Sequence, residues 1–411
     1  MSSTRMNPRL ELPSERSIIA AVWPALLASA LGLLPFTLLS TFLIPMAQWA
    51  GAEVAEIGSL RGLAGIGAVI VGVVLAPLIG RILPGTVAAA SLVLLGLAAI
   101  IGTFSGTWAL ATFCLATGMS NALLYPALST AAADRLGEGP AAGRAATLVM
   151  TAQTLASTAG APLLVLPAMW WGWQGNLVAI AIAAFALAPA LLRFGRQGTQ
   201  PGPPKPALKY AAAFRTLGRI RGARALLLVS FGRAGAFMGH LAFLAPLYAE
   251  KFQLSTGWFA CVWSLSGGSF FLGHLLAGRM LNAEGAAPRP RIWMVACLGT
   301  SLAALLCVYF APVLPLALAG TAVLSASHAV VAAAVTSLLV QRCSEVRGTA
   351  LSLNAAGMSL GLFLGTGACG VALAMGGYSA ACAVLVGFTI LSLIAAVNVG
   401  SSLAEPVRQG S

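Results

Sequence analysis

Charged side chains are scarce in this sequence. Asp, Glu, Lys and Arg together make up 8% of the 411 residues, whereas a soluble domain carries about a quarter. Apolar residues make up 59%. A chain with so few polar side chains cannot cover its surface with polar groups in water, which excludes an ordinary soluble protein. The composition instead predicts a protein that is partly solvated by the lipid bilayer.

Recognisable catalytic motifs are also lacking. The sequence contains no Gly-rich phosphate loop, no HExxH and no GxSxG motif. The seven cysteines are scattered, mostly within apolar stretches, and none has CxxC spacing. Cysteines placed in this way are typical of small packing residues rather than of disulfides or metal sites. We therefore predict that the protein is not an enzyme and uses no cofactor and no metal.

The apolar residues form stretches long enough to cross a bilayer, which takes about twenty residues in a helix. The first stretch begins at Ile18 and exceeds the apolar core of a cleavable signal peptide, so we interpret it as a retained helix. Only Pro312 to Pro315 separate the ninth stretch from the tenth. The sequence predicts an all-α membrane protein with twelve transmembrane helices, at residues 18–46, 57–80, 86–105, 108–132, 145–169, 175–193, 224–248, 257–281, 291–312, 313–340, 348–374 and 378–400.

The placement of positive charge supports this count. With both termini in the cytoplasm, 20 of the 23 Lys and Arg residues fall on the cytoplasmic side, only Lys251 falls outside, and Arg61 and Arg233 lie within helices. This asymmetry follows the positive-inside rule and explains the net charge of +13 without a nucleic-acid partner. Abundant Ala, Gly and Arg with only three lysines are typical of a GC-rich bacterial genome, so we expect a bacterial cytoplasmic (inner) membrane.

The chain also divides into two similar halves. The longest polar interruption contains Gln197–Pro206, a segment with the composition of a linker. We predict a six-helix bundle at 1–192, a cytoplasmic linker at 193–223 and a second six-helix bundle at 224–411. The halves repeat, because Gly80-Arg81 after the second helix corresponds to Gly278-Arg279 after the eighth. Duplicated six-helix units are how many transporters build a central site.

Several motifs carry a family resemblance. They are the basic turn at Arg81, the strings STAGAPLLVLP (157–167) with Gly160 and Pro162 and WWGWQGNL (170–177), and the string RGTALSLNAAGMSLG (347–361). With these motifs the whole chain resembles the major facilitator superfamily, and the last string is similar to its drug and metabolite efflux branch, which includes sugar and nucleoside exporters. Two positions depart from the family pattern. Gly80 stands where the family has an acid, and Cys114 stands where it has an arginine, which weakens the transfer of a proton-antiport mechanism.

Glycines spaced four apart predict a packing surface. Gly357, Gly361 and Gly365 form GxxxGxxxG in the eleventh predicted helix. Small residues with this spacing let two helix backbones approach closely. In an alternating-access transporter we expect such a surface to take part in the conformational change.

Acidic residues are lacking from the middle of every predicted helix. A proton-coupled transporter usually needs a group that titrates inside the bilayer, most often a carboxylate. Glu53 and Glu56, at the outer end of the second helix, are the nearest coupling candidates. The alternative is that both lie in a solvated loop.

The predicted helices instead contain cationic and imidazole side chains. Arg233 and His240 are seven residues apart and therefore share one face of the seventh helix, and His328 lies near the middle of the tenth. An arginine in the hydrocarbon is costly unless it is paired or hydrated, so we predict a functional role for Arg233. Arg61 has the alternative of pairing with Glu56. His240 and His328 are coupling candidates as well, with core packing as their alternative, and packing is the favoured reading for His274.

The family resemblance implies which residues line the cavity. In the superfamily, helices one, four, seven and ten face it. Carried to this sequence, that implies substrate contacts from Trp23, Phe36, Thr37, Thr117, Asn121, Tyr125, Arg233, Phe237, His240, Ser325 and His328. We also keep Arg61 as a substrate-binding candidate. Aromatic side chains with a few polar groups suit a largely apolar ligand site.

The sequence leaves three functional hypotheses. The first is secondary active export of a small organic solute, linked to protons through His240, His328 or the Glu53 and Glu56 pair. The second is an exchanger, symporter or facilitator of an organic anion that binds to intramembrane arginine. A receptor that transports nothing is the third, and the short loops disfavour it. We expect the partner to be a small molecule, anionic or amphipathic, and the chain to act as a monomer, since twelve helices can enclose their own pathway.

Overall fold

The computed structural model describes residues 14–72, 82–137, 140–196, 210–220, 222–281, 290–343 and 346–399. Within these ranges the chain is almost entirely helical. The helices of the first half are α1 (Glu15–Thr41), α2 (Leu43–Ala50), α3 (Val54–Leu60), α4 (Leu63–Ile70), α6 (Pro84–Ile101), α7 (Thr107–Arg135) and α8 (Pro140–Arg196). Those of the second half are α9 (Tyr210–Arg219), α10 (Ala223–Phe252), α11 (Thr256–Leu281), α12 (Pro290–Phe310), α13 (Leu314–Arg342) and α14 (Arg347–Val397).

The prediction of twelve transmembrane helices is confirmed. Nine helices in the described ranges are long and apolar enough to cross a membrane. Two of them, α8 with 57 residues and α14 with 51, each contain two crossings joined at a kink, at Gly172 and at Gly376–Gly377. Gly172 and Gly377 have φ values of 70° and 64°, a left-handed conformation that glycine adopts without strain. The short helices α3 and α4 together form the twelfth crossing.

The boundaries differ from the prediction in several places. The first predicted helix breaks at Phe42, between α1 and α2, and the second breaks at Arg61–Gly62, between α3 and α4. Helix α9 lies within the predicted linker, whereas Gln197–Pro206 falls outside the described residues, as does Arg81. The backbone of Arg279 belongs to α11, but its side chain is outside the described part. The division into two bundles at 193–223 stays a prediction.

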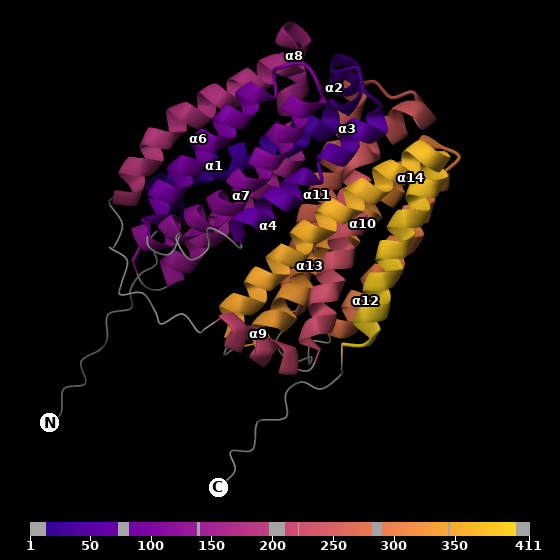
Figure 1. The fold of residues 1–411 in the computed structure, drawn as a ribbon. Helices are drawn as coiled ribbons and strands as arrows, with labels where there is room; N and C mark the ends of the chain where they lie inside the picture. The colour runs from indigo at the N-terminus through magenta and orange to yellow at the C-terminus, as the bar shows by residue number, and fades with distance from the viewer. Residues whose placement is uncertain are drawn as a thin grey trace, which may run out of the picture.

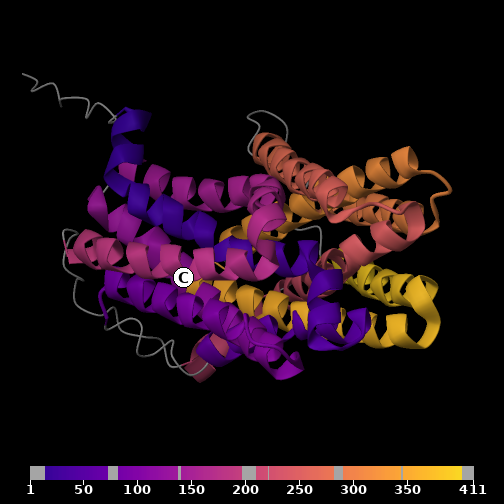
Figure 2. The same ribbon diagram turned by 90° about the horizontal axis from the view of Figure 1, so that it is seen from above.

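The two ends of the long helices define two faces of the molecule. We call the end where α1 begins and α14 finishes the terminal face, and the end that carries the Gly172 and Gly376–Gly377 kinks the opposite face (Figure 1). Figure 2 shows the helices of the first half, indigo to magenta, gathered on one side and those of the second half, orange to yellow, on the other. The two groups of helices diverge toward the terminal face (Figure 1).

Glycines mark the places where the halves touch. A Cβ atom on Gly65 of α4 would lie 2.1 Å from the carbonyl oxygen of Ser359 in α14, so these backbones are in direct contact. A Cβ atom on Gly267 of α11 would lie 2.6 Å from the carbonyl oxygen of Ser157 in α8. Beside it, the Ser264 hydroxyl donates a hydrogen bond of 2.7 Å to the carbonyl oxygen of Thr158. A Cβ atom on Gly370 of α14 would likewise lie 2.8 Å from the carbonyl oxygen of Ala55 in α3. The halves therefore meet through backbone-close pairs in which α3 and α4 face α14 and α8 faces α11.

The predicted GxxxGxxxG surface lies against α10. Cβ atoms on Gly361 and Gly365 would each come within 2.2 Å of an α10 carbonyl oxygen, whereas Gly357 has more room, at 3.7 Å. Glycine is thus required at Gly361 and Gly365 for α14 to approach α10 this closely. This packing leaves α10 the most buried of the nine long helices.

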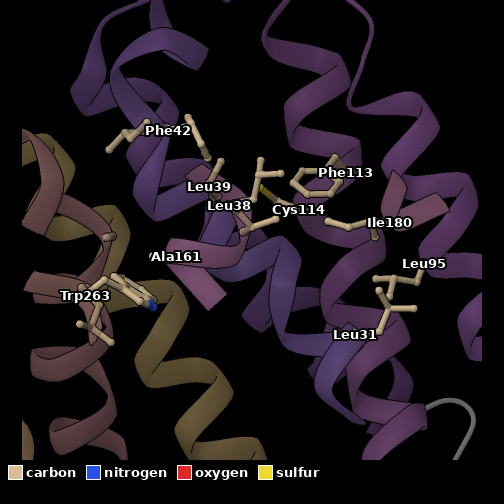
Figure 3. Packing of buried hydrophobic residues seen from close by; sticks show 14 of the residues in the cluster. Leu31, Leu38, Leu39, Phe42, Leu95, Phe113, Cys114, Ala161, Ile180 and Trp263 are labelled. Carbon is tan, nitrogen blue, oxygen red and sulfur yellow. The ribbon is translucent and has the colours of Figure 1, made fainter. Parts of the chain in front are cut away.

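The first half has a continuous apolar core. Figure 3 shows Leu38 of α1 beside Phe113 and Cys114 of α7, with Ile180 of α8 next to them. Nearer the terminal face, Leu31 of α1 lies beside Leu95 of α6 (Figure 3). These side chains are buried and interlock, which fixes α1, α6, α7 and α8 against one another.

Candidate functional site

Arg233 lies at the centre of the second half. It belongs to α10 and is only 2% exposed. Its Nε and Nη1 atoms have no hydrogen-bond partner among the described residues. Leaving a buried guanidinium unpaired costs several kcal/mol, so a side chain in this position requires a functional reason. The unused donors make Arg233 a ready site for a negatively charged group or a strong hydrogen-bond acceptor.

Three histidines lie in the same part of the second half as Arg233. His240 follows it by nearly two turns on α10, His328 comes from α13 and His274 from α11. Arg233 is near enough to interact electrostatically with His274 and His328, and His240 interacts with His328 in the same way. The Nδ1 atoms of His240 and His328 are buried and have no partner in the described part of the chain. The structure thus gathers Arg233, His240 and His328 in one region, and their roles in binding and coupling stay predictions.

Stacked rings join these groups. Phe237 of α10 stacks on His328 with ring centroids 4.8 Å apart and on Phe270 of α11 at 5.4 Å. Phe270 in turn makes an edge contact of 4.8 Å with His274. A nearby hydrogen bond of 2.8 Å links Ser325 to Ser266. The aromatic rings hold the imidazoles in place and offer an apolar surface to a ligand.

Sequence reasoning missed two aromatic residues here. Phe270 lies in α11 and Tyr309 in α12, outside the helices that the family resemblance places at the cavity. The Tyr309 ring lies 5.9 Å from that of His240, and its hydroxyl is buried without a partner in the described residues. The only available sequence signal was a polar aromatic residue within an apolar helix, which is too common to be specific.

The first half contributes a neutral polar cluster. The Asn121 side chain of α7 donates a hydrogen bond of 2.9 Å to the carbonyl oxygen of Gly32 in α1. Its Oδ1 atom is buried without a partner among the described residues, and the Tyr125 hydroxyl is buried beside the Gln153 side chain. A Cβ atom on Gly32 would lie 3.0 Å from Asn121 Oδ1 and 3.1 Å from the Tyr125 hydroxyl. The Thr117 hydroxyl, one turn before Asn121, is also without a partner in the described chain. Asn121 and Tyr125 are therefore brought together, and the free Asn121 Oδ1 and Thr117 hydroxyl can bind polar groups of a neutral ligand.

Thr37 lies against the predicted helix-five motif. It is fully buried, and its side chain is 3.2 Å from the place that a Cβ atom on Gly160 would occupy. Gly160 and Pro162 both belong to the first part of α8. The motif thus positions α8 close to α1.

Arg61 forms a separate cluster at the break between α3 and α4. It is 4% exposed, donates a hydrogen bond to the Ser40 hydroxyl and stacks over the Phe36 ring at 5.4 Å. Its Nε atom has no partner among the described residues. Glu56 is exposed, so Arg61 is held by α1 rather than by the acid that the sequence offered as an alternative.

Trp23 lies apart from these clusters. It is 49% exposed and shares a face of α1 with the exposed Ile19 and Leu27. Glu53 precedes α3 and is exposed, as is Glu56. None of the five acids in the described ranges is buried. The buried ionisable groups in those ranges are therefore cationic, imidazole, phenol and thiol groups.

Comparisons with known proteins agree with this architecture. A family model described as Major Facilitator Superfamily matches residues 25–292, more than half of the chain. A chloramphenicol resistance protein of Streptomyces lividans is 30% identical over 167 residues, which cover 40% of this chain and 41% of that protein. The chain thus matches about two fifths of the length of this curated relative.

Solved structures share the fold at low identity. A bacterial homolog of the human lysosomal transporter Spinster, in an inward-facing and occupied conformation, has a TM-score of 0.72 and 15% identity over 94% of this chain and 97% of that one. The nucleoside transporter NupG has a TM-score of 0.64 and 17% identity, covering 91% and 98% of the two chains. The human organic anion transporter MFSD10 has a TM-score of 0.63 and 19% identity, covering 93% and 100%. The chain is a multi-pass membrane protein that belongs to the Major Facilitator Superfamily.

Proposed function

We propose that this protein exports a small organic solute in exchange for protons, and that the solute carries both a hydrogen-bond acceptor and a hydrogen-bond donor. The observation that carries the proposal is the buried Arg233 with its unused Nε and Nη1 atoms beside the free Nδ1 atoms of His240 and His328. The resistance relative from Streptomyces lividans supports export as the direction.

Arg233 supplies the affinity in this proposal. A hydrogen bond to a charged group contributes about 1.5–3 kcal/mol, and two parallel ones fix the orientation of the acceptor. A solute without the acceptor leaves the buried guanidinium unpaired, so the site discriminates strongly against it. Asn121 and Tyr125 can bind further polar groups of the solute from the first half.

The imidazoles supply the coupling. A neutral imidazole nitrogen offers one lone pair, which either accepts a hydrogen bond from the solute or takes up a proton. Solute and proton therefore compete for the Nδ1 atoms of His240 and His328. Competition for one site is the requirement for exchange, because each occupant must leave before the other binds. Histidine suits this task because its ordinary pKa lies near neutrality.

A second candidate is transport of an organic anion together with protons or without them. It is favoured by Arg233 and by the absence of a buried acid from the described ranges. An anion bound to Arg233 attracts positive charge, so protonation of His328 would strengthen its binding rather than oppose it. The two candidates thus predict opposite effects of pH on affinity.

The orientation and assembly belong to the same proposal. We place the terminal face in the cytoplasm of a bacterium, because that orientation obeys the positive-inside rule. The chain acts as a monomer, since the described helices of both halves pack into one structure with its own buried polar site.

Thermal stabilisation across a ligand panel tests the proposal. Chloramphenicol and a set of organic anions are added to the purified protein at several pH values. A ligand present at 100 times its Kd raises the apparent stability by about 2.7 kcal/mol. Exchange predicts that affinity falls as the pH falls, whereas anion cotransport predicts that it rises. Transport into proteoliposomes of the ligands that bind, with and without a pH gradient, then measures the coupling.

Variants of Arg233 make the test specific. Arg233→Ala abolishes stabilisation by the ligand, and Arg233→Lys retains part of it because the charge remains. The control is Arg16→Ala, which removes an exposed arginine and leaves binding unchanged. Full binding by Arg233→Ala would contradict both candidates.

A further inference from the structure

We propose that the terminal face of the second half binds the headgroup of an anionic phospholipid. The site, which we call the basic site, consists of Arg219, Arg224, Arg291 and Arg342. It is distinct from the buried cluster, because Arg224 precedes Arg233 on α10 by nine residues, about 14 Å along the helix axis. The lipid comes from the surrounding leaflet, so the basic site does not depend on which solute is transported or on how transport is coupled.

Helix α9 forms one edge of the basic site. It lies across the terminal face of the second half and packs against α10 and α14 (Figure 1). Its Leu217 is buried in an apolar cluster with Leu226 of α10, whereas Arg215 and Arg219 on the same helix are exposed. A helix with one apolar and one basic side is typical of a segment that lies at the surface of a membrane.

The turn between α9 and α10 brings two more arginines to this edge. The Arg224 Nη2 atom lies 3.1 Å from the place that a Cβ atom on Gly218 would occupy. The Arg342 Nη1 atom, at the end of α13, lies 2.5 Å from the corresponding place on Gly222. Both guanidinium groups therefore lie against the same short turn, where the two glycines leave room for them.

The fourth arginine reaches the site from α12. The place that a Cβ atom on Gly222 would occupy is also 3.8 Å from the Val399 side chain, just after α14. Two residues earlier, the Val397 carbonyl oxygen accepts a hydrogen bond of 2.6 Å from the Arg291 Nη2 atom. The end of α14 thus joins Arg291 to the turn that carries Arg342.

The basic site borders a surface that suits acyl chains. Ile292 and Trp293 directly follow Arg291 and are exposed, as are Ile394 and Val397 at the end of α14. Exposed apolar side chains on membrane-spanning helices contact lipid, and tryptophan is enriched at the level of the headgroups. A lipid whose chains lie on this surface therefore has its headgroup beside Arg291.

The charge of the basic site calls for an anion. Arg219 and Arg224 form no hydrogen bond or ion pair within the described ranges. The described part of the second half contains a single acid, Glu250, near the end of α10 at the opposite face. On the terminal face of the first half, by contrast, Arg144 forms an ion pair with Glu15.

A phospholipid fits both features of the site. Guanidinium groups bind phosphate oxygens through two parallel hydrogen bonds, which favours a phosphate headgroup. Free phosphate would satisfy the arginines and leave the apolar border in contact with other molecules. A phospholipid supplies the phosphate together with the chains that cover this border.

A lipid titration of the whole protein in neutral detergent tests the site. The probes are dioctanoyl phosphatidylglycerol, which is anionic, and dioctanoyl phosphatidylcholine, which is neutral. Native mass spectrometry resolves the protein with and without one bound lipid and gives a Kd for each probe, and the anionic lipid should bind more tightly. One arginine near an anionic headgroup contributes about 1 kcal/mol, or about 5-fold in affinity. We therefore expect Arg219→Gln with Arg224→Gln to weaken phosphatidylglycerol binding about 25-fold and to leave phosphatidylcholine binding unchanged.

The matched control is Arg16→Gln with Arg144→Gln, which removes the same charge from the terminal face of the first half. It should bind phosphatidylglycerol with wild-type affinity, and Arg219→Lys with Arg224→Lys should retain most of that affinity. Equal weakening in the control would show a general attraction to a basic face and would refute the basic site. Wild-type affinity in the Arg219→Gln, Arg224→Gln variant would refute it as well. Inorganic phosphate at the concentration of the lipid should not displace it, and displacement would assign the site to a free anion instead.

None of these measurements involves transport. Failure of the basic site would therefore leave the proposed function standing, and failure of the proposed function would leave the basic site standing.

Discussion

The contact between α4 and α14 offers a direct test of how the two halves control the conformation. In Gly65→Ala the new methyl group would lie 2.1 Å from the Ser359 carbonyl oxygen and 3.1 Å from the Phe363 nitrogen. Both are backbone atoms, so no side chain can rotate away. An ordinary contact begins at 3.4 Å, so the two helices must separate by more than 1 Å.

The magnitude follows from the cost of overpacking, which is about 1–3 kcal/mol. The cost arises only in conformations in which α4 touches α14, and the gain in helix propensity from alanine is the same in all conformations. The substitution therefore shifts the equilibrium by about 5- to 150-fold toward a state that is open at the opposite face. Apparent affinity for a solute that enters from the terminal face falls by a comparable factor.

The assay measures the distance between the halves at the opposite face. Spin labels at Ser105→Cys and Gly257→Cys, both exposed, report it by double electron–electron resonance after Cys261, an exposed cysteine, is replaced by serine. We expect Gly65→Ala to populate longer distances.

Two glycines of α14 provide controls for this assay. Gly361→Ala meets the Phe231 carbonyl oxygen at 2.2 Å inside the second half, so it should lower stability without changing the distances. Gly367 has open space around it, and Gly367→Ala should change neither. The reasoning is refuted if Gly65→Ala keeps the wild-type distances, or if Gly361→Ala shifts them equally.

Three further predictions concern the polar groups. Arg233→Met removes an unpaired buried charge, so we expect a melting temperature higher than that of the wild type and no stabilisation by the ligand. A lower melting temperature would show that the guanidinium is paired in the wild type. The double variant Glu53→Gln, Glu56→Gln should transport at the wild-type rate in proteoliposomes with a pH gradient, since both acids are exposed. A loss of proton coupling in this variant would show that the two acids take part in the mechanism. Gly32→Ala places a methyl group 3.0 Å from Asn121 Oδ1 and should weaken ligand binding in the thermal assay more than it lowers stability, and the reverse order would assign Asn121 to packing alone.

The number of membrane crossings could be read from the sequence because it depends on apolar length. The cost of burying polar groups in lipid acts on every residue of a crossing, so twenty apolar residues are a strong signal. The break at Arg61–Gly62 could not be predicted in this way. It depends on a tertiary contact, in which Ser40 and Phe36 of α1 hold the Arg61 side chain while Gly62 packs against α14.

Part of the candidate site could be predicted because ionisable side chains are rare in membrane-spanning helices, so the few that occur there stand out. Arg233, His240 and His328 were recognisable because each is an ionisable residue inside an apolar helix. Tyr309 and Phe270 were not, because aromatic residues are common in such helices and only the folded structure shows which of them touch an imidazole. Trp23 was selected through the family resemblance, and the structure places it on an exposed face of α1.

The two halves contribute different kinds of polar side chains to the candidate site, and this difference affects how the substrate specificity of the transporter can evolve. Arg233, His240 and His328 lie in the second half, whereas Asn121 and Tyr125 of the first half are neutral at ordinary pH. The buried Arg61 of the first half forms a separate cluster with Ser40 and Phe36. The close backbone contacts between the halves at Gly65 and Gly267 carry no charge. Substitutions at Asn121 or Tyr125 can therefore alter which solute is bound without disturbing either the coupling groups or the contact between the halves. Selection for a new solute should act first on Asn121 and Tyr125.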